Sequence, residues 1–488
     1  MTISLPLEDG PSDPVGFADF MAGLTSKSLR SAIGDLWLED LEAKAEADDR
    51  SLSNECVRLL RETYLSLDHK PAASEVPAAA ASGDAALGVT FQESKRLPIF
   101  GWYPYVEGFS APYVREVLKR FDARRSVYDP FGGSGTTQLA ASIAGLESWY
   151  CEVNPFMGFV AETKLNASRA ARGELERSTT LLGEFRRRLD SELPRWAKKA
   201  DLTSYHEAFP GREFFEEQHI RDLLGALDLA ASVAGDDSAV HDLLRLSVAA
   251  NAVLASNMTR RADLRRRRPD EYKNRVVDVQ AMLSEAVTRM ERDLRSHPKN
   301  AKPSHFVAAD CRQAPSEFDG AFELAITSPP YLNGTNYFRN TKIELWMLGF
   351  LNSERDLSKF RNQAVCAGIN NVSKSRPSYN TFADVEAVAE QLDAGAGDKR
   401  IPLLVRHYFS DMSDVMASVF RVLEPGGRFV FDIGDSKFYG VHVPTDRLLE
   451  AIAESVGLVV ESSAVLAKRY SRDKSQLVQR ELVFRKAS

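Results

Sequence analysis

Cysteine is scarce in this chain of 488 residues, and its four cysteines, Cys56, Cys151, Cys311 and Cys366, lie far apart. No CxxC pair occurs, and no histidine stands at the spacing of a zinc ligand, so the sequence indicates neither a disulfide framework nor a metal site. Long apolar runs are also missing, since nowhere do about 18 apolar residues follow one another. The N-terminus has no basic region followed by an apolar run, which argues against export. We therefore expect a cytoplasmic protein without a membrane span.

An excess of positive charge is lacking as well. The chain has 62 Lys and Arg against 69 Asp and Glu, which gives a net charge of -7. Such a protein does not coat nucleic acid indiscriminately, so any nucleic-acid surface must be local. The hydrophobic fraction of 44% is ordinary for a globular protein, and the length suits about two to four domains.

Strands alternate with helices over much of the chain. Short β-rich runs occur at residues 126–130, 148–153, 305–310, 323–330, 428–435 and 481–486, with helical stretches such as 136–145 and 445–456 between them. Repeated strand, helix, strand units predict an α/β fold with a doubly wound, mostly parallel sheet. The pattern divides the chain into a helical N-terminal region (1–70), an Ala/Pro-rich linker (71–90), a first α/β half (91–165), a helical insertion (166–300) and a second α/β half (301–488).

The strongest local signal is a glycine-rich turn, DPFGGSGTT at 129–137, which ends a β-rich run and opens a helix. Glycines let the backbone turn tightly and approach a ligand where a Cβ would clash. A P-loop would need a lysine after Gly135, and the chain has Thr136 there. A dinucleotide site would want a third glycine where Gln138 stands, so neither alternative fits well.

Two motifs resemble the S-adenosylmethionine-dependent DNA amino-methyltransferases. Phe131, Gly133 and Gly135 match the FxGxG signature of that family, and the stretch SPPY at 328–331 matches its (D/N/S)PP(Y/F) tetrapeptide. The resemblance covers roughly residues 97–165 and 303–488. It implies a Rossmann-like class I methyltransferase fold and S-adenosylmethionine as the cofactor.

Further positions are assigned to the cofactor. The resemblance implies that Asp129 and the glycine turn as far as Thr136 hold the amino acid end of S-adenosylmethionine. Glu152 follows the next predicted strand, where an acid can accept both ribose hydroxyl hydrogens; a solvated strand-end carboxylate is the alternative. Low-specificity matches of the same kind place Phe109 and Ser110 against the methionine moiety and Asp310, with Cys311, at the adenine.

The tetrapeptide carries the catalytic assignment. An exocyclic amine is a poor nucleophile because its lone pair is delocalised into the ring, so its N–H groups must be held by acceptors that favour a pyramidal nitrogen. Ser328 Oγ and the Pro329 carbonyl can be those acceptors, while Pro329 and Pro330 stiffen the loop. Tyr331 offers a face on which an extruded base can stack.

The resemblance also indicates the target. In the family, SPPY goes mostly with cytosine N4, whereas DPPY and NPPY go mostly with adenine N6, which is the alternative. Methylation of cytosine C5 is disfavoured, because that route needs a cysteine nucleophile, typically after a proline, and none of the four cysteines follows one. An RNA base amino-methyltransferase and a non-catalytic subunit with the same fold are the remaining readings.

Double-stranded DNA is the expected partner. An arginine cluster in the insertion and polar or aromatic residues beyond the tetrapeptide are the expected contacts, although the cluster could equally be a solvated helix face balanced by acids. These residues are Arg260, Arg261, Arg265, Arg266, Asn336, Tyr337 and Arg339. We expect a bacterial or archaeal, nucleoid-associated enzyme; its target sequence, oligomeric state and any restriction or defence partner are left open by the sequence.

Overall fold

The computed structural model describes residues 91–105, 108–260, 264–273, 275–332, 337–372, 379–470 and 475–488. The expected helical region at 1–70 and the linker at 71–90 lie outside the described residues. So do Arg261 and Asn336 among the expected DNA contacts.

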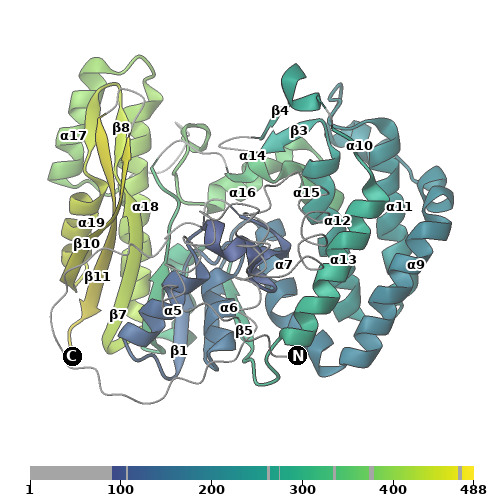
Figure 1. Ribbon diagram of the computed structural model, residues 1–488. Coiled ribbons are helices and arrows are strands. Elements are labelled where there is room, and N and C mark those ends of the chain that lie inside the picture. The colour runs from purple at the N-terminus through teal and green to yellow at the C-terminus, as the bar shows by residue number, and fades with distance from the viewer. Residues whose placement is uncertain are drawn as a thin grey trace, which may run out of the picture. The chain divides into compact units, whose positions relative to one another are not determined.

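A seven-stranded sheet forms the centre of the described chain (Figure 1). Its order is β10 (Leu458–Tyr470), β11 (Gln476–Lys486), β7 (Leu423–Gly434), β6 (Phe322–Thr327), β1 (Ser126–Asp129), β2 (Glu147–Cys151) and β5 (Ser304–Ala308). The five strands from β7 to β5 are parallel, and β11 runs antiparallel to both β7 and β10. The strand order reverses between β1 and β6, which is where open α/β sheets bind their ligands.

The central strands are buried on both faces, which is why they read as short apolar runs. Along β6, Leu324 and Ile326 belong to one core cluster, whereas Ala325 between them belongs to a second one. This alternation is the two-residue period of a strand covered by helices on both sides. The predicted doubly wound, mostly parallel Rossmann-like fold is thereby confirmed.

Helices supply the two covering layers. The first cluster includes α5 (Ala111–Arg120), α6 (Thr136–Ile143) and α7 (Pro155–Glu162). The second includes α17 (Ala383–Gly395), α18 (Arg400–Val422) and α19 (Thr445–Ser455). Shorter elements are η1 (Phe91–Arg96), η2 (Phe100–Trp102), η5 (Cys311–Gln313), η6 (Ser316–Phe318), α14 (Tyr337–Asn340), α15 (Lys342–Met347), η7 (Glu354–Asp356), α16 (Leu357–Gln363), η8 (Ile369–Asn371), β8 (Ser436–Phe438) and β9 (Val441–Val443).

The insertion is helical as expected, with one correction. It contains η3 (Thr163–Ala167), α8 (Ser168–Gly173), α9 (Leu175–Lys199), α10 (Thr203–Ala208), α11 (Glu217–Ala234), α12 (Ser238–Ala255), η4 (Pro269–Tyr272) and α13 (Val279–Ser296). The arginine cluster, however, lies on a hairpin of β3 (Met258–Arg260) and β4 (Leu264–Arg266), because Thr259 pairs with Arg265 across it. The reading as a helix face is therefore wrong.

The insertion packs directly against the α/β layer. Leu243 and Leu244 of α12 are fully buried in the same cluster as Phe156 of α7 and Ile343 of α15. The insertion therefore completes one face of the core and stands beside the sheet (Figure 1). Among the described residues, no helix is long and apolar enough to cross a membrane.

Candidate active site

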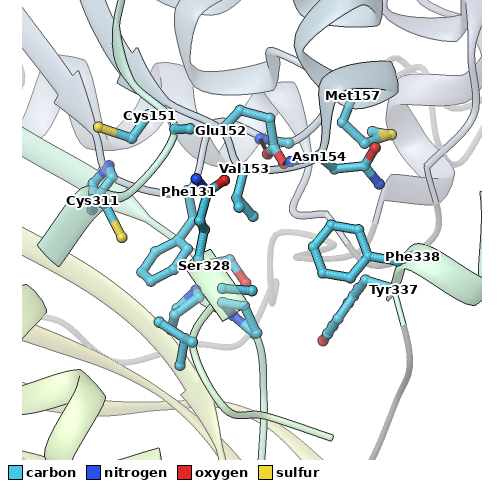
Figure 2. A pocket seen from close by; sticks show the side chains of 18 of the residues that line it. Phe131, Cys151, Glu152, Val153, Asn154, Met157, Cys311, Ser328, Tyr337 and Phe338 are labelled. Carbon is cyan, nitrogen blue, oxygen red and sulfur yellow. Dashed lines mark hydrogen bonds between the residues drawn. The ribbon is translucent and has the colours of Figure 1, made fainter. Parts of the chain in front are cut away.

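The glycine loop after β1 and the SPP loop after β6 line one pocket at the carboxyl edge of the sheet. Figure 2 shows Phe131 and Ser328 on one side of this space and Tyr337 and Phe338 across from them. The pocket is lined by Tyr105, Pro130, Phe131, Gly133, Cys151, Glu152, Val153, Asn154, Met157, Ala309, Cys311, Ser328, Pro329, Pro330, Tyr337, Phe338, Gln363, Ala364, Val365 and Asn371. The two motifs that the sequence singled out thus share one cleft.

Backbone geometry explains the glycines of the first loop. Gly133 and Gly135 have φ values of 52° and 80°, which favour glycine over residues with a side chain. A Cβ at Gly132 would come within 2.8 Å of the Tyr150 ring, so the loop can lie against β2 only with glycine there. Gly135 is also the N-cap of α6, whose first residue is Thr136. The loop therefore presents backbone at the start of a helix, as ligand-binding glycine turns do.

Glu152 stands at the end of β2 and faces the pocket. Its carboxylate accepts hydrogen bonds from the Gly133 amide at 2.8 Å and from the Asn154 amide at 2.7 Å. Burial raises the pKa of Glu152 from its usual 4.5 to about 7, although the two backbone bonds oppose this shift. Each oxygen keeps a second lone pair, so the carboxylate can still accept from a diol.

Asp129 joins the two loops beneath the pocket. Its Oδ1 accepts from Thr327 Oγ1 at 2.6 Å and from the Phe131 amide at 2.9 Å. Asp129 is 2% exposed and is not among the lining residues. Because Thr327 directly precedes Ser328, this carboxylate fixes the exit of β6 relative to the exit of β1.

The SPP loop after β6 is held by side chains of the next two strands of the sheet, β7 and β11. Ser328, Pro329 and Pro330 line the pocket, whereas the Tyr331 hydroxyl donates to Asp432 Oδ1 on β7 at 3.0 Å. Gln479 Nε2 on β11 donates to the Tyr331 hydroxyl and to both Asp432 oxygens. Tyr331 is thereby anchored at its hydroxyl end and is not a lining residue, while the aromatic rings in the lining are those of Tyr105, Phe131, Tyr337 and Phe338.

An ion-pair network lies behind the part of the pocket that Cys311 and Gln363 line. Arg312 binds Asp310 at 2.7 Å and Asp411 of α18 at 2.9 Å, and it donates to the Gln363 carbonyl at 3.2 Å. The other oxygen of Asp411 accepts from the Cys366 amide. Asp310 is therefore engaged by Arg312 and is not a lining residue, while its neighbour Cys311 is one.

The other predicted residues are placed as follows. Ser110 is buried and caps α5 by accepting from the Tyr113 amide, and Phe109 packs against the Tyr113 ring; neither lines the pocket. Arg260 is turned inward, where it donates to the Asn340 carbonyl and pairs with Glu344. Arg265, Arg266 and Arg339 line a separate groove.

Several lining residues were missed by the sequence reasoning. Tyr105, Asn154 and Phe338 stand within one to five residues of motif positions, so their neighbourhood was a usable signal. Gln363 and Asn371 come from a stretch with no motif and reach the pocket only through the fold. The Oδ1 atom of Asn371 is buried and has no hydrogen-bond partner within the described residues.

The strand order and the pocket at its reversal point define a Rossmann-like methyltransferase fold. No protein-family model matches the chain. It is similar to the Type II methyltransferase M.AvaI of Nostoc sp., with 24% identity over 78% of this chain and 83% of the relative. It is also similar to the Type II methyltransferase M.BsoBI of Geobacillus stearothermophilus, with 23% identity over 80% of this chain and 84% of the relative.

A solved SAM-dependent methyltransferase from Methanosarcina mazei also matches, with 9% identity over 76% of this chain and 97% of that one. Its TM-score is 0.26, so the fold assignment rests on the observed sheet order instead. The names of the two sequence relatives agree with the methyltransferase class that the motifs predicted.

Proposed function

We propose that this protein is a site-specific DNA methyltransferase that transfers a methyl group from S-adenosylmethionine to the exocyclic N4 of cytosine. The observation that carries the proposal is the single pocket shared by Gly133 and Glu152 on one side and Ser328 and Pro329 on the other. Methyl transfer needs this arrangement, because the donor carbon and the acceptor amine must be held in near-attack geometry.

The residues present fit S-adenosylmethionine. The loop at Gly133 offers close backbone approach, the Glu152 carboxylate suits a ribose diol, and Val153 and Met157 give apolar walls. When bound, the cofactor supplies an electrophilic sulfonium methyl. Cys311 and Val365 line the part of the pocket beside the Asp310–Arg312 pair, and we assign the adenine to that part.

The target amine is assigned to the SPP loop. Ser328 Oγ and the Pro329 carbonyl accept hydrogen bonds from the amine's N–H groups, so that the nitrogen lone pair can attack the methyl carbon as the bond between that carbon and sulfur breaks. The nitrogen then gives up one N–H proton to solvent. The rings of Tyr337 and Phe338, across from Ser328 in Figure 2, offer stacking faces for a base flipped out of the duplex. Asp129, which is bonded to Thr327, holds this loop in register with the glycine loop.

The buried thiols favour amine chemistry over attack on the cytosine ring. Cys151 and Cys311 both line the pocket. Burial raises the pKa of Cys151 to about 12 and raises that of Cys311 well above its usual value. Neither thiol ionises readily near neutral pH, so neither is suited to be the nucleophile of C5 methylation.

The serine of SPPY favours cytosine N4 over adenine N6, which is the second candidate. Similarity to two Type II methyltransferases supports DNA as the substrate over RNA, and it makes a cognate restriction nuclease a partner worth seeking.

The test is to identify the product. The purified protein is incubated with labelled S-adenosylmethionine and, in parallel reactions, with mixed-sequence duplex DNA or with cellular RNA, and the digested nucleosides are identified by mass spectrometry. We expect N4-methylcytosine, and long-read sequencing of host DNA then gives its sequence context. N6-methyladenine would replace the target base, whereas label in RNA alone, or in no nucleic acid, would overturn the proposal.

A further inference from the structure

A basic groove lies beside the active-site pocket. It comprises two overlapping cavities that share Arg212, Arg339 and Lys342 in their lining. Six cationic side chains face it, against the two carboxylates of Glu213 and Glu354; these cations are Arg212, Arg265, Arg266, Arg339, Lys342 and Arg361. In a protein of net charge -7, such a concentration of positive charge marks a surface for an anion.

The basic groove adjoins the pocket through two helices. On α14, Tyr337 and Phe338 line the pocket and the next residue, Arg339, lines the groove. At the end of α16, Gln363 lines the pocket while Arg361, two residues earlier, lines the groove. Figure 1 shows α14 and α16 together with the β3–β4 hairpin at the upper edge of the molecule. A DNA strand whose base enters the pocket would therefore continue along the groove.

Part of the positive charge is already balanced and part is open to solvent. Lys342 pairs with Glu354, and Arg265 makes a two-pronged pair with Glu271. The side chain of Arg266 is 59% exposed, and its carboxylate neighbour, Glu213, is 3.9 Å away. Arg212 is exposed in the loop between α10 and α11. Exposed guanidinium groups of this kind suit phosphate oxygens, which they bind through two parallel N–H donors.

We propose that the basic groove binds the phosphate backbone of the DNA beside the flipped target base, with Arg212 and Arg266 as phosphate ligands. The inference rests on the proposed function in that DNA is the substrate. It assigns the α10–α11 loop and the β3–β4 hairpin, both parts of the insertion, to substrate binding. Contacts of this type fix the position of the duplex and carry no base sequence information.

The experiment measures DNA binding apart from methyl transfer. Fluorescence anisotropy of mixed-sequence duplexes is recorded at several salt concentrations for the wild type and for Arg212→Gln/Arg266→Gln. Loss of two phosphate contacts should lower the magnitude of the slope of log K against log salt by about 2 and weaken binding on the order of tenfold, equally for all sequences. The matched control is Arg295→Gln, an exposed arginine in the last turn of α13, which should behave as the wild type does.

Two further readouts separate this inference from the proposed function. Calorimetric affinity for S-adenosylmethionine should be the same in the double variant and the wild type, which also shows that the variant is folded. Unchanged DNA affinity and salt slope in the double variant would overturn the groove assignment while leaving methyl transfer intact. A wild type that binds DNA through these arginines and transfers no methyl group would support the groove and refute the proposed function.

Discussion

The two loops that meet in the active-site pocket follow neighbouring parallel strands, yet they are opposite in chemistry. The loop after β1 is built from glycines with positive φ at Gly133 and Gly135, so it offers amide donors and close approach. The loop after β6 is built from Pro329 and Pro330, which lack amide hydrogens, so it offers oxygen acceptors on a stiff backbone. One edge of a sheet can thus hold an electrophile and present a nucleophile a short distance apart.

The Ser328→Ala variant best distinguishes the role of the SPP loop from that of the glycine loop. We expect kcat for methyl transfer to fall on the order of 10²- to 10³-fold, because an acceptor needed mainly in the transition state is lost. Affinity for S-adenosylmethionine, measured by calorimetry, should stay within about twofold. Ser462→Ala on the exposed face of β10 is the control and should be fully active. Equal kcat in Ser328→Ala and wild type would remove Ser328 from the mechanism.

The converse change is Gly133→Val in the glycine loop. A β-branched residue at a φ of 52° is strained by about 1–2 kcal/mol, and its side chain would stand near the Tyr105 ring in the pocket lining. We expect cofactor affinity to fall on the order of tenfold to a hundredfold. Gly145→Val is the matched control, since Gly145 has a φ of 84° and nothing within 4 Å of its Cβ position. If both variants bound the cofactor equally well, the cofactor site would have to lie elsewhere.

Lowering the pH should first weaken cofactor binding at the glycine loop, beside which Glu152 lies. In the proposed function the carboxylate form of Glu152 accepts hydrogen bonds from the ribose hydroxyls, and the pKa of about 7 means that this group is partly protonated near neutrality. Cofactor affinity should therefore fall as the pH drops below 7, by up to about tenfold per unit. A carboxyl at its usual pKa would give no change between pH 8 and 6. Titration calorimetry across this range checks the expectation, and Glu152→Gln should be weaker with a flat profile.

The smallest expected effect concerns the hydrogen bond from Thr327 to Asp129, which links the loop after β6 to the loop after β1. Thr327→Val removes the donor to Asp129 and leaves a buried carboxylate short of one partner, which should lower the free energy of unfolding by about 1–3 kcal/mol. Thr327→Ser keeps the hydroxyl and should lose less. Urea denaturation of the three proteins measures the difference. A valine variant as stable as the wild type would show that the loops are held in register by other contacts.

The parts of the fold that the sequence predicted are those with strong local patterns. Strands β1, β2 and β6 are short, largely buried apolar runs, and they and the edge strand β5 were each expected at nearly their observed places. Strand β10 was missed because it is an edge strand whose middle, residues 461–465, is exposed, so that polar residues divide its apolar ones into two short runs. A helix face was the alternative reading of the arginine cluster, because a run of charge looks the same on a helix and on a hairpin.

The active-site pocket likewise contains residues that a local pattern predicted and residues that it did not. Gly133 and Ser328 were singled out because their segments resemble the family's FxGxG and SPPY motifs, and Glu152 because it follows the next predicted strand. Arg312 gave no such signal, since its role depends on Asp411, 99 residues away. The assigned roles of the motif residues stay predictions until the variants above are measured.

By itself, the sequence determined the chemistry of each loop, because backbone conformation, hydrogen-bonding capacity and stiffness are properties of a few consecutive residues. Only the tertiary structure decided that the loops face each other, that Gln363 and Asn371 line the pocket, and that arginines from the insertion gather in a groove beside it. Those outcomes depend on strand order and on packing between segments that lie tens to hundreds of residues apart, which no local pattern encodes.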